Sequence, residues 1–263
     1  MNQVEAQEAA KLLNQARNAG AVIAALPEGL RPTQRIEGYQ IQQALEALDE
    51  RKVFGWKIAA TSAAGQAHIG IDGPIAGRLF SDTVHQNGET LPFGANRMRV
   101  AEAEFAFQMG RTLCPQARPY EMAEVLSAIA DLYLAIEIPD SRYENFVTAG
   151  GPQLIADNAC ADRFVLGPRA PELWREIDLV EHKTLGRVTG QSEFPGIGAN
   201  VLGDPRLALL WLVNELSSLG IALEAGQYVT TGTTTVPMPI KPGDQVIADF
   251  GILGEVSCRF DEQ

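Results

Sequence analysis

The sequence predicts an α+β fold, in which a helical N-terminal region (residues 1–52) continues into a β-rich domain (residues 53–263) as one structural unit. Apolar residues recur at helical spacing before residue 50, and short apolar runs typical of strands dominate from residue 53 onward. No repeat, low-complexity tract or linker divides the chain. With 263 residues, 46% of them hydrophobic, the chain can bury one large core.

Four helices are expected from apolar residues at three- and four-residue spacing. Gly20 is the stop signal of the first helix, and Thr33 precedes the start of the second. Asp204 is a capping residue followed by Pro205 at the first helical position. The four expected ranges are 3–18, 34–48, 119–132 and 205–219.

Eight segments read as strands because they are short, apolar and bounded by turn residues. Their ranges are 53–59, 99–109, 134–138, 163–166, 182–188, 227–231, 244–250 and 254–260. Pro-Gly-Asp and Gly-Ile-Leu-Gly turns separate the last three, which predicts that these three pair in antiparallel fashion. The expected body is therefore a largely antiparallel β structure with helices packed outside it.

Charge and composition exclude several classes of function. The chain has 21 Lys and Arg against 33 Asp and Glu, a net charge of −12, so it is not expected to bind nucleic acid or an anionic membrane surface. No apolar run approaches the roughly 18 residues of a membrane span, and the N-terminus lacks the pattern of a secretory signal. Three widely spaced cysteines fit a cytoplasmic protein. With only three histidines, any metal is expected to be held mainly by oxygen.

Glu102 and Glu104 are the most informative pair of residues. Side chains two apart in a strand share a face, so both carboxylates point the same way while the alternating apolar residues face a core. Two adjacent carboxylates repel each other, and a divalent cation would compensate that repulsion. A solvated strand face with two glutamates is the alternative.

Glu137 is a single carboxylate inside the apolar segment 134–138. Such a group is rarely buried unpaired, so we expect it to be a third metal ligand or the partner of Arg142 or Arg99. Three carboxylates, with the remaining positions left to water, suit Mg²⁺ or Mn²⁺.

Three further motifs carry polar groups that can take part in chemistry. Lys57 lies inside an apolar strand, where burial and a nearby metal would lower its pKa and make it a proton shuttle, unless it forms a structural salt bridge. Asp157 and Asn158 form a polar turn that can orient a ligand or simply reverse the chain. Thr231 and Thr233 belong to a threonine-rich loop that can bind a substrate carboxylate or serve only as a hairpin turn.

From residue 53 to the C-terminus, these motifs in order resemble the 2-keto-4-pentenoate hydratase and 4-oxalocrotonate decarboxylase branch of the fumarylacetoacetate hydrolase superfamily. The motifs that carry the resemblance are Gly55-Trp56-Lys57-Ile58, Glu102-Ala-Glu104, Ala135-Ile-Glu137-Ile-Pro-Asp140-Ser-Arg142, Asp157-Asn158-Ala159, Gly203-Asp-Pro205 with Trp211-Leu-Val-Asn214, and Thr231-Gly232-Thr233 followed by Pro242-Gly243-Asp244.

The resemblance implies a mixed β-sandwich roll with an N-terminal helical region, assembled as a homo-oligomer. It implies that Glu102, Glu104 and Glu137 hold Mg²⁺ or Mn²⁺ and that Lys57 is the active-site lysine. The implied substrates are short 2-oxo or 2-hydroxydienoic acids from aromatic-ring degradation.

The chain departs from the family pattern at residues 72–79. Many hydratases carry an acidic Glu-Pro-Asp-like motif there, whereas this chain keeps Asp72, a catalytic candidate, lacks the following acid and adds Arg78. We expect Arg78 to set substrate preference by pairing with a distal carboxylate, unless it is a surface arginine on a loop.

The leading hypothesis is a metal-dependent hydratase that adds water to a 2-hydroxydienoate and gives a 4-hydroxy-2-oxo acid. Decarboxylation of a 2-oxo-3-enedioate at the same site is the first alternative. Hydrolysis of an acylpyruvate is another, although that reaction usually needs a histidine. A non-catalytic domain that only binds a cation is the last.

Overall fold

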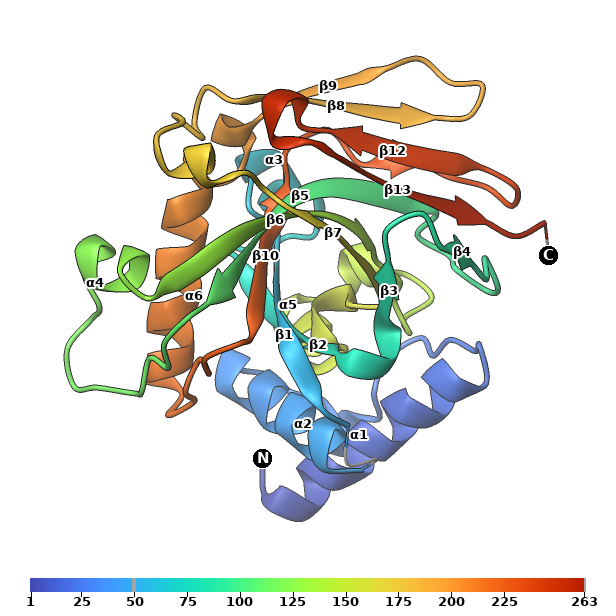
Figure 1. The fold of residues 1–263 in the computed structure, drawn as a ribbon. Helices are drawn as coiled ribbons and strands as arrows, with labels where there is room; N and C mark the ends of the chain where they lie inside the picture. Colours follow the sequence, from blue (N-terminus) through green and yellow to red (C-terminus); the bar gives the residue numbers. More distant parts are fainter. Residues whose placement is uncertain (49–50, 263) are drawn as a thin grey trace.

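The computed structural model describes residues 1–48 and 51–262, and two β-sheets form the body of the protein (Figure 1). The larger sheet has the order β2-β1-β10-β5-β6-β7-β3, with β11 also paired to β5, and the smaller has the order β4-β13-β12-β8-β9. The strands are β1 (Val53–Ala59), β2 (Ile75–Phe80), β3 (Val84–Gln86), β4 (Thr90–Leu91), β5 (Val100–Met109), β6 (Ile129–Ile138), β7 (Arg163–Arg169), β8 (Lys183–Val188), β9 (Phe194–Ile197), β10 (Tyr228–Thr233), β11 (Met238–Pro239), β12 (Gln245–Asp249) and β13 (Glu255–Phe260).

Most strand pairs are antiparallel, but β1 with β10, β3 with β7 and β13 with β4 are parallel, so both sheets are mixed. The two edge strands of the larger sheet, β2 and β3, are separated by only the three-residue turn Ser81–Thr83. Three residues span at most about 11 Å, so the two edges lie close and the sheet curls into a roll. The predicted α+β class and mixed sandwich roll are confirmed.

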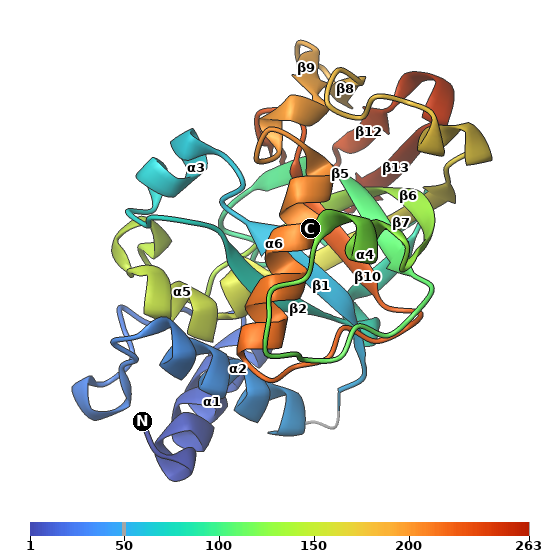
Figure 2. The same cartoon turned by 90° about the vertical axis from the view of Figure 1, so that its left-hand side faces the viewer.

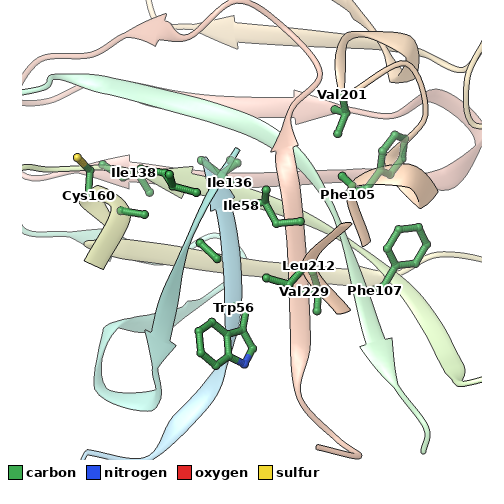
Figure 3. Close-up of a cluster of buried hydrophobic side chains, with 14 of the residues drawn as sticks. Trp56, Ile58, Phe105, Phe107, Ile136, Ile138, Cys160, Val201, Leu212 and Val229 are labelled. Carbon is green, nitrogen blue, oxygen red and sulfur yellow. The ribbon is translucent and has the colours of Figure 1, made fainter. Parts of the chain in front are cut away.

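The two faces of the larger sheet differ in chemistry. The outer face is apolar and forms the main core, part of which Figure 3 shows around Trp56, Phe105 and Val229. The inner face of the roll holds the charged side chains described below. Beneath them it holds a small separate cluster, formed by Leu79, Ala106, Ala135 and Phe164.

The helices pack around this body. They are α1 (Gln3–Asn18), α2 (Arg35–Leu48), α3 (Ala63–His68), α4 (Met122–Leu126), α5 (Gly151–Ala156) and α6 (Pro205–Ser218). Helices α1 and α2 pack on each other and α2 on α5, while α3 and α5 lie on one side of the molecule (Figure 2). None of the described helices is long and apolar enough to cross a membrane.

Many expected elements are found where the sequence predicts them. Helix α1 matches the prediction, and α6 begins with Asp204 as its cap and Pro205 at its first position. Strand β1 has the predicted bounds, and β12 and β13 form the predicted hairpin. Strands β2, β3, β4, β9 and β11 were not predicted, because they are short or lack alternation.

Two predictions are wrong. The helix expected at 119–132 ends at Leu126, and Ile129 already begins strand β6. Apolar residues in this segment fit a helical spacing, but those from Leu132 to Ile138 also alternate as in a strand. Pairing with β5 and β7 stabilises the strand. The other error concerns β10, which lies between β1 and β5 in the larger sheet and does not join the β12–β13 hairpin.

The predicted domain boundary at residues 52 and 53 stays a prediction, and the neighbouring residues 49 and 50 lie outside the described part of the chain. Buried residues of α1 and α2 belong to the same apolar core as those of the sheets.

A strained turn follows α5 and packs against β2. Asn158, Ala159 and Cys160 have φ values of 56°, 50° and 60°, a region that non-glycine residues rarely occupy. The Asn158 side chain secures the turn, because its Nδ2 donates to the Arg78 carbonyl oxygen and its Oδ1 accepts from the Arg78 amide, both at 2.7 Å. Gly77 leaves room for this approach, since a Cβ there would lie 2.0 Å from the Asn158 carbonyl oxygen.

We therefore expect Gly77→Ala to lower the free energy of unfolding by about 1–3 kcal/mol or more, as overpacking of a filled site does. Urea denaturation measures the effect. The matched control is Gly73→Ala, two residues before β2, where an added Cβ meets nothing within 4 Å. Equal stability of the two variants would contradict this account of the turn.

Candidate metal centre and active site

Strand pairing brings three carboxylates together on the inner face of the larger sheet. Glu102 on β5 lies directly opposite Glu137 on β6, and Glu104 follows two residues along β5 on the same face. One oxygen from each of the three residues lies within 4.8 Å of the others. The cluster predicted from spacing on two separate strands is thus assembled by the register of β5 and β6.

The three carboxylates differ in how their oxygens are satisfied. Glu104 accepts hydrogen bonds from the Thr230 hydroxyl and from the Gly232 amide, the latter at 2.8 Å. Glu137 is fully buried, and neither of its oxygens has a hydrogen-bond partner among the described residues. A buried carboxylate without donors is costly, and a divalent cation with oxygen ligands is the group that would compensate it. The donor set therefore fits Mg²⁺ or Mn²⁺.

Burial and mutual repulsion disfavour the ionised forms of the three acids. Burial, with the charge of Glu102, raises the pKa of Glu104 to about 8. Burial also raises the pKa of Glu102, and it raises that of Glu137 well above its ordinary value. Protons and a cation therefore compete for these three carboxylates.

Lys57 on β1 points to the same face as the three acids and is buried. Its Nζ donates to the Ala159 carbonyl oxygen at 2.8 Å and lies 3.4 Å from Oε1 of Glu137. Burial lowers the pKa of Lys57, but the charges of Glu137 and Glu102 raise it more, so the net direction is upward. The alternative of a salt bridge is observed, and a lowered pKa of Lys57 beside a metal stays a prediction.

A cavity of about 670 Å³ opens over Lys57 and Glu102. Thr233 lines it, and its role in substrate binding stays a prediction. Further polar groups on its walls come from Thr61, Ser62, His68, Asn200 and Thr235. An acid small enough to enter can therefore reach a lysine and a carboxylate at the same end of the cavity.

Four other predicted residues lie elsewhere. Thr231 faces the opposite side of β10, where its hydroxyl donates to the Phe105 carbonyl oxygen. Asp157 is buried and forms an ion pair with Arg142, which removes Arg142 as a partner of Glu137. Asn158 holds the strained turn. Asp72 is exposed and does not line the cavity.

The position of Arg78 corrects both readings of this residue. It is buried, its guanidinium donates to Glu46 and Gln42 at 2.8 Å each, and it lies over the Trp56 ring at 4.6 Å. Arg78 pairs in register with Trp56, so its side chain leaves the sheet on the face opposite Lys57. It is neither a surface residue nor a group in the cavity.

Sequence reasoning missed Thr230 and the Ala159 carbonyl, which contact Glu104 and Lys57. Thr230 shares a face with Lys57 through the register of β1 and β10. The threonine-rich composition drew attention to this loop, but alternation alone could not say which threonines face inward.

No protein-family profile matches the chain. It is 34% identical over 253 residues to 2-keto-4-pentenoate hydratase of Burkholderia vietnamiensis (strain G4 / LMG 22486), covering 95% of each chain. It is also 32% identical over 231 residues to 4-oxalocrotonate decarboxylase of Pseudomonas putida, covering 85% of this chain and 84% of the relative.

A solved structure agrees with these matches. The 4-oxalocrotonate decarboxylase of Pseudomonas putida G7, complexed with magnesium and adipate, superposes with a TM-score of 0.89 at 27% identity, covering 99% of this chain and 98% of that one. The chain therefore belongs to the 2-keto-4-pentenoate hydratase and 4-oxalocrotonate decarboxylase branch of the fumarylacetoacetate hydrolase superfamily.

Proposed function

We propose that this protein is a divalent-metal-dependent hydratase, which adds water to a short 2-hydroxydienoate or 2-oxo-enoate and gives a 4-hydroxy-2-oxo acid. The observation that carries the proposal is that Lys57 and Glu102 line one end of a cavity, with the buried carboxylates of Glu104 and Glu137 clustered beside them. The hydratase names of several relatives with more than 30% identity support it.

Glu102, Glu104 and Glu137 would hold the cation, for which we propose Mg²⁺, with Mn²⁺ as the other ion that the ligand set suits. The magnesium complex of the structural relative supports this choice. When bound, the cation supplies Lewis-acid stabilisation of negative charge on a substrate that it chelates.

The rest of the chemistry belongs to side chains. Lys57 is the proton carrier at this end of the cavity, and its hydrogen bond to Ala159 fixes the position of Nζ. Thr233 and Asn200 line the cavity, and hydrogen bonds to the Thr235 and Thr234 carbonyl oxygens hold their side chains in place beside the substrate. Lys57 gives a proton to the dienoate, water gives its hydroxyl, and the proton released from that water returns to Lys57, so that one water is added in all.

Decarboxylation at the same site is the alternative, and the decarboxylase relatives support it. Acylpyruvate hydrolysis has less support. His182 Nε2 donates to the Phe250 carbonyl oxygen, and among the described residues that line the cavity the one histidine is His68. We further propose that the protein works in the cytoplasm as a homo-oligomer, in line with its composition and its family.

Ultraviolet absorbance of a 2-hydroxydienoate, followed with and without Mg²⁺, tests the function. Loss of conjugation that depends on Mg²⁺ and releases no CO₂ supports the hydratase. Release of CO₂ from a 2-oxo-3-enedioate would support the decarboxylase, and no change with either substrate would leave only cation binding.

The metal ligands can be tested by calorimetric titration with Mg²⁺. Glu102→Gln and Glu137→Gln should each weaken binding at least tenfold, because each removes one negative ligand. The exposed Glu255→Gln is the control, with an expected affinity equal to wild type. Unchanged affinity in both ligand variants would rule out this metal site.

Replacing Lys57 separates catalysis from structure. Lys57→Met keeps most of the side-chain volume, so turnover should fall about 10²–10⁴-fold while Mg²⁺ affinity stays within tenfold of wild type. Lys52→Met, on an exposed lysine just before the same strand, should leave both quantities unchanged. If the variant instead loses Mg²⁺ affinity and stability, and its turnover falls only because of those losses, Lys57 is a structural residue.

The metal-free protein should lose stability as pH rises from about 5 to about 8. Folded Glu104, with a pKa of about 8, keeps a proton that the unfolded chain releases above its ordinary pKa of 4.5, so the stabilisation is complete below 4.5 and gone above 8. Urea denaturation across this range measures the slope. Glu104→Gln and saturating Mg²⁺ should each flatten it, and an equal slope in all three samples would refute the assignment.

A further inference from the structure

Apolar side chains follow the charged groups along three strands on the inner face of the larger sheet. Moving two residues along each strand, on the same face, leads from Lys57 to Ala59, from Glu102 to Val100 and from Glu137 to Pro139. On β2, Ile75 lies opposite Ala59. All four of these apolar residues line the cavity, and we call Ala59, Ile75, Val100 and Pro139 the apolar ring.

The walls beyond the apolar ring are also mostly uncharged. They include Ile69, Met98, Phe146 and Leu154. Among the described residues that line the cavity, the side chains that can carry positive charge are Lys57, at the charged end, and His68. His68 is exposed, and its ring packs against Phe146 with 6.0 Å between centroids.

Two features of β2 contribute to this apolar character. Ile75 follows Pro74 and is almost fully buried in the wall. Arg78, the cation that could have met a distal carboxylate, leaves the sheet on the other face and is already paired. A substrate carboxylate beyond the apolar ring would therefore lose its hydration without gaining a cation.

We infer that this cavity selects 2-oxo and 2-hydroxydienoic acids whose far end is uncharged and apolar, and that it rejects dicarboxylic acids. The inference rests on the proposed function for the orientation of the substrate, with its carboxylate at the charged end. At about 670 Å³, the cavity lies in the size range that holds drug-sized ligands, so it admits a tail longer than that of a five-carbon acid.

Equilibrium binding tests the inference separately from catalysis. We would titrate the full chain, at saturating Mg²⁺, with the matched unreactive seven-carbon acids 2-oxoheptanoate and 2-oxoheptanedioate. The monocarboxylic acid should bind at least tenfold more tightly. Equal binding, tighter binding of the dioate, or binding of neither acid would overturn the inference. Absence of hydratase turnover together with a retained preference would remove only the proposed function.

Two arginine substitutions place the selectivity in the cavity. Phe146→Arg adds a cation to the half-buried wall and should reduce the preference at least tenfold, whereas Ile252→Arg, at a position 69% exposed and outside the cavity, should leave it unchanged. Equal effects of both substitutions would overturn the assignment. A wild-type preference for the dioate that disappears in His68→Gln would also overturn it, and would identify His68 as the distal partner.

Discussion

The clustering of three carboxylates, two of them buried, on one face of a sheet is the constraint on which the rest of the structure depends. The register of β5 and β6 holds Glu102 and Glu137 opposite each other, and two oxygens of Glu137 have no hydrogen-bond donor among the described residues. The inner face below the carboxylates is filled with apolar side chains, so water cannot relieve the repulsion from that side. Lys57 and the donors that reach Glu104 provide part of the compensation, and the three acids form a group that could hold a metal ion.

The surroundings of Lys57 show how the fold maintains this arrangement. The carbonyl that accepts from Lys57 belongs to a turn with three consecutive left-handed residues, and strain of this kind costs about 1–3 kcal/mol per residue. The Asn158 side chain ties the turn to β2, and the buried Arg142–Asp157 ion pair lies at its start. The strain thus persists next to the chemistry because well-satisfied polar contacts on both sides secure it.

The buried arginines Arg142 and Arg78 serve the fold and add no charge to the cavity. Arg142 is paired with Asp157, and Arg78 with Glu46 over the ring of Trp56. A buried charge without a partner is expensive, so these guanidiniums cannot leave their partners to meet a substrate. The charge of the cavity wall therefore depends on which face of a strand an arginine side chain occupies, as well as on how many arginines the sequence contains.

The sequence by itself determined the fold class, the capped helix α6, strand β1 and the identity of the three acids. Local periodicity and capping dictate these features. Only the tertiary structure decided which residues meet in space. Strand β6 includes residues whose spacing also predicts a helix, because β6 pairs with β5 on one side and with β7 on the other. Alternation could not show that Thr230 faces inward while Arg78 faces outward. The inward face of a strand is defined by its neighbours, and those neighbours come from distant parts of the chain.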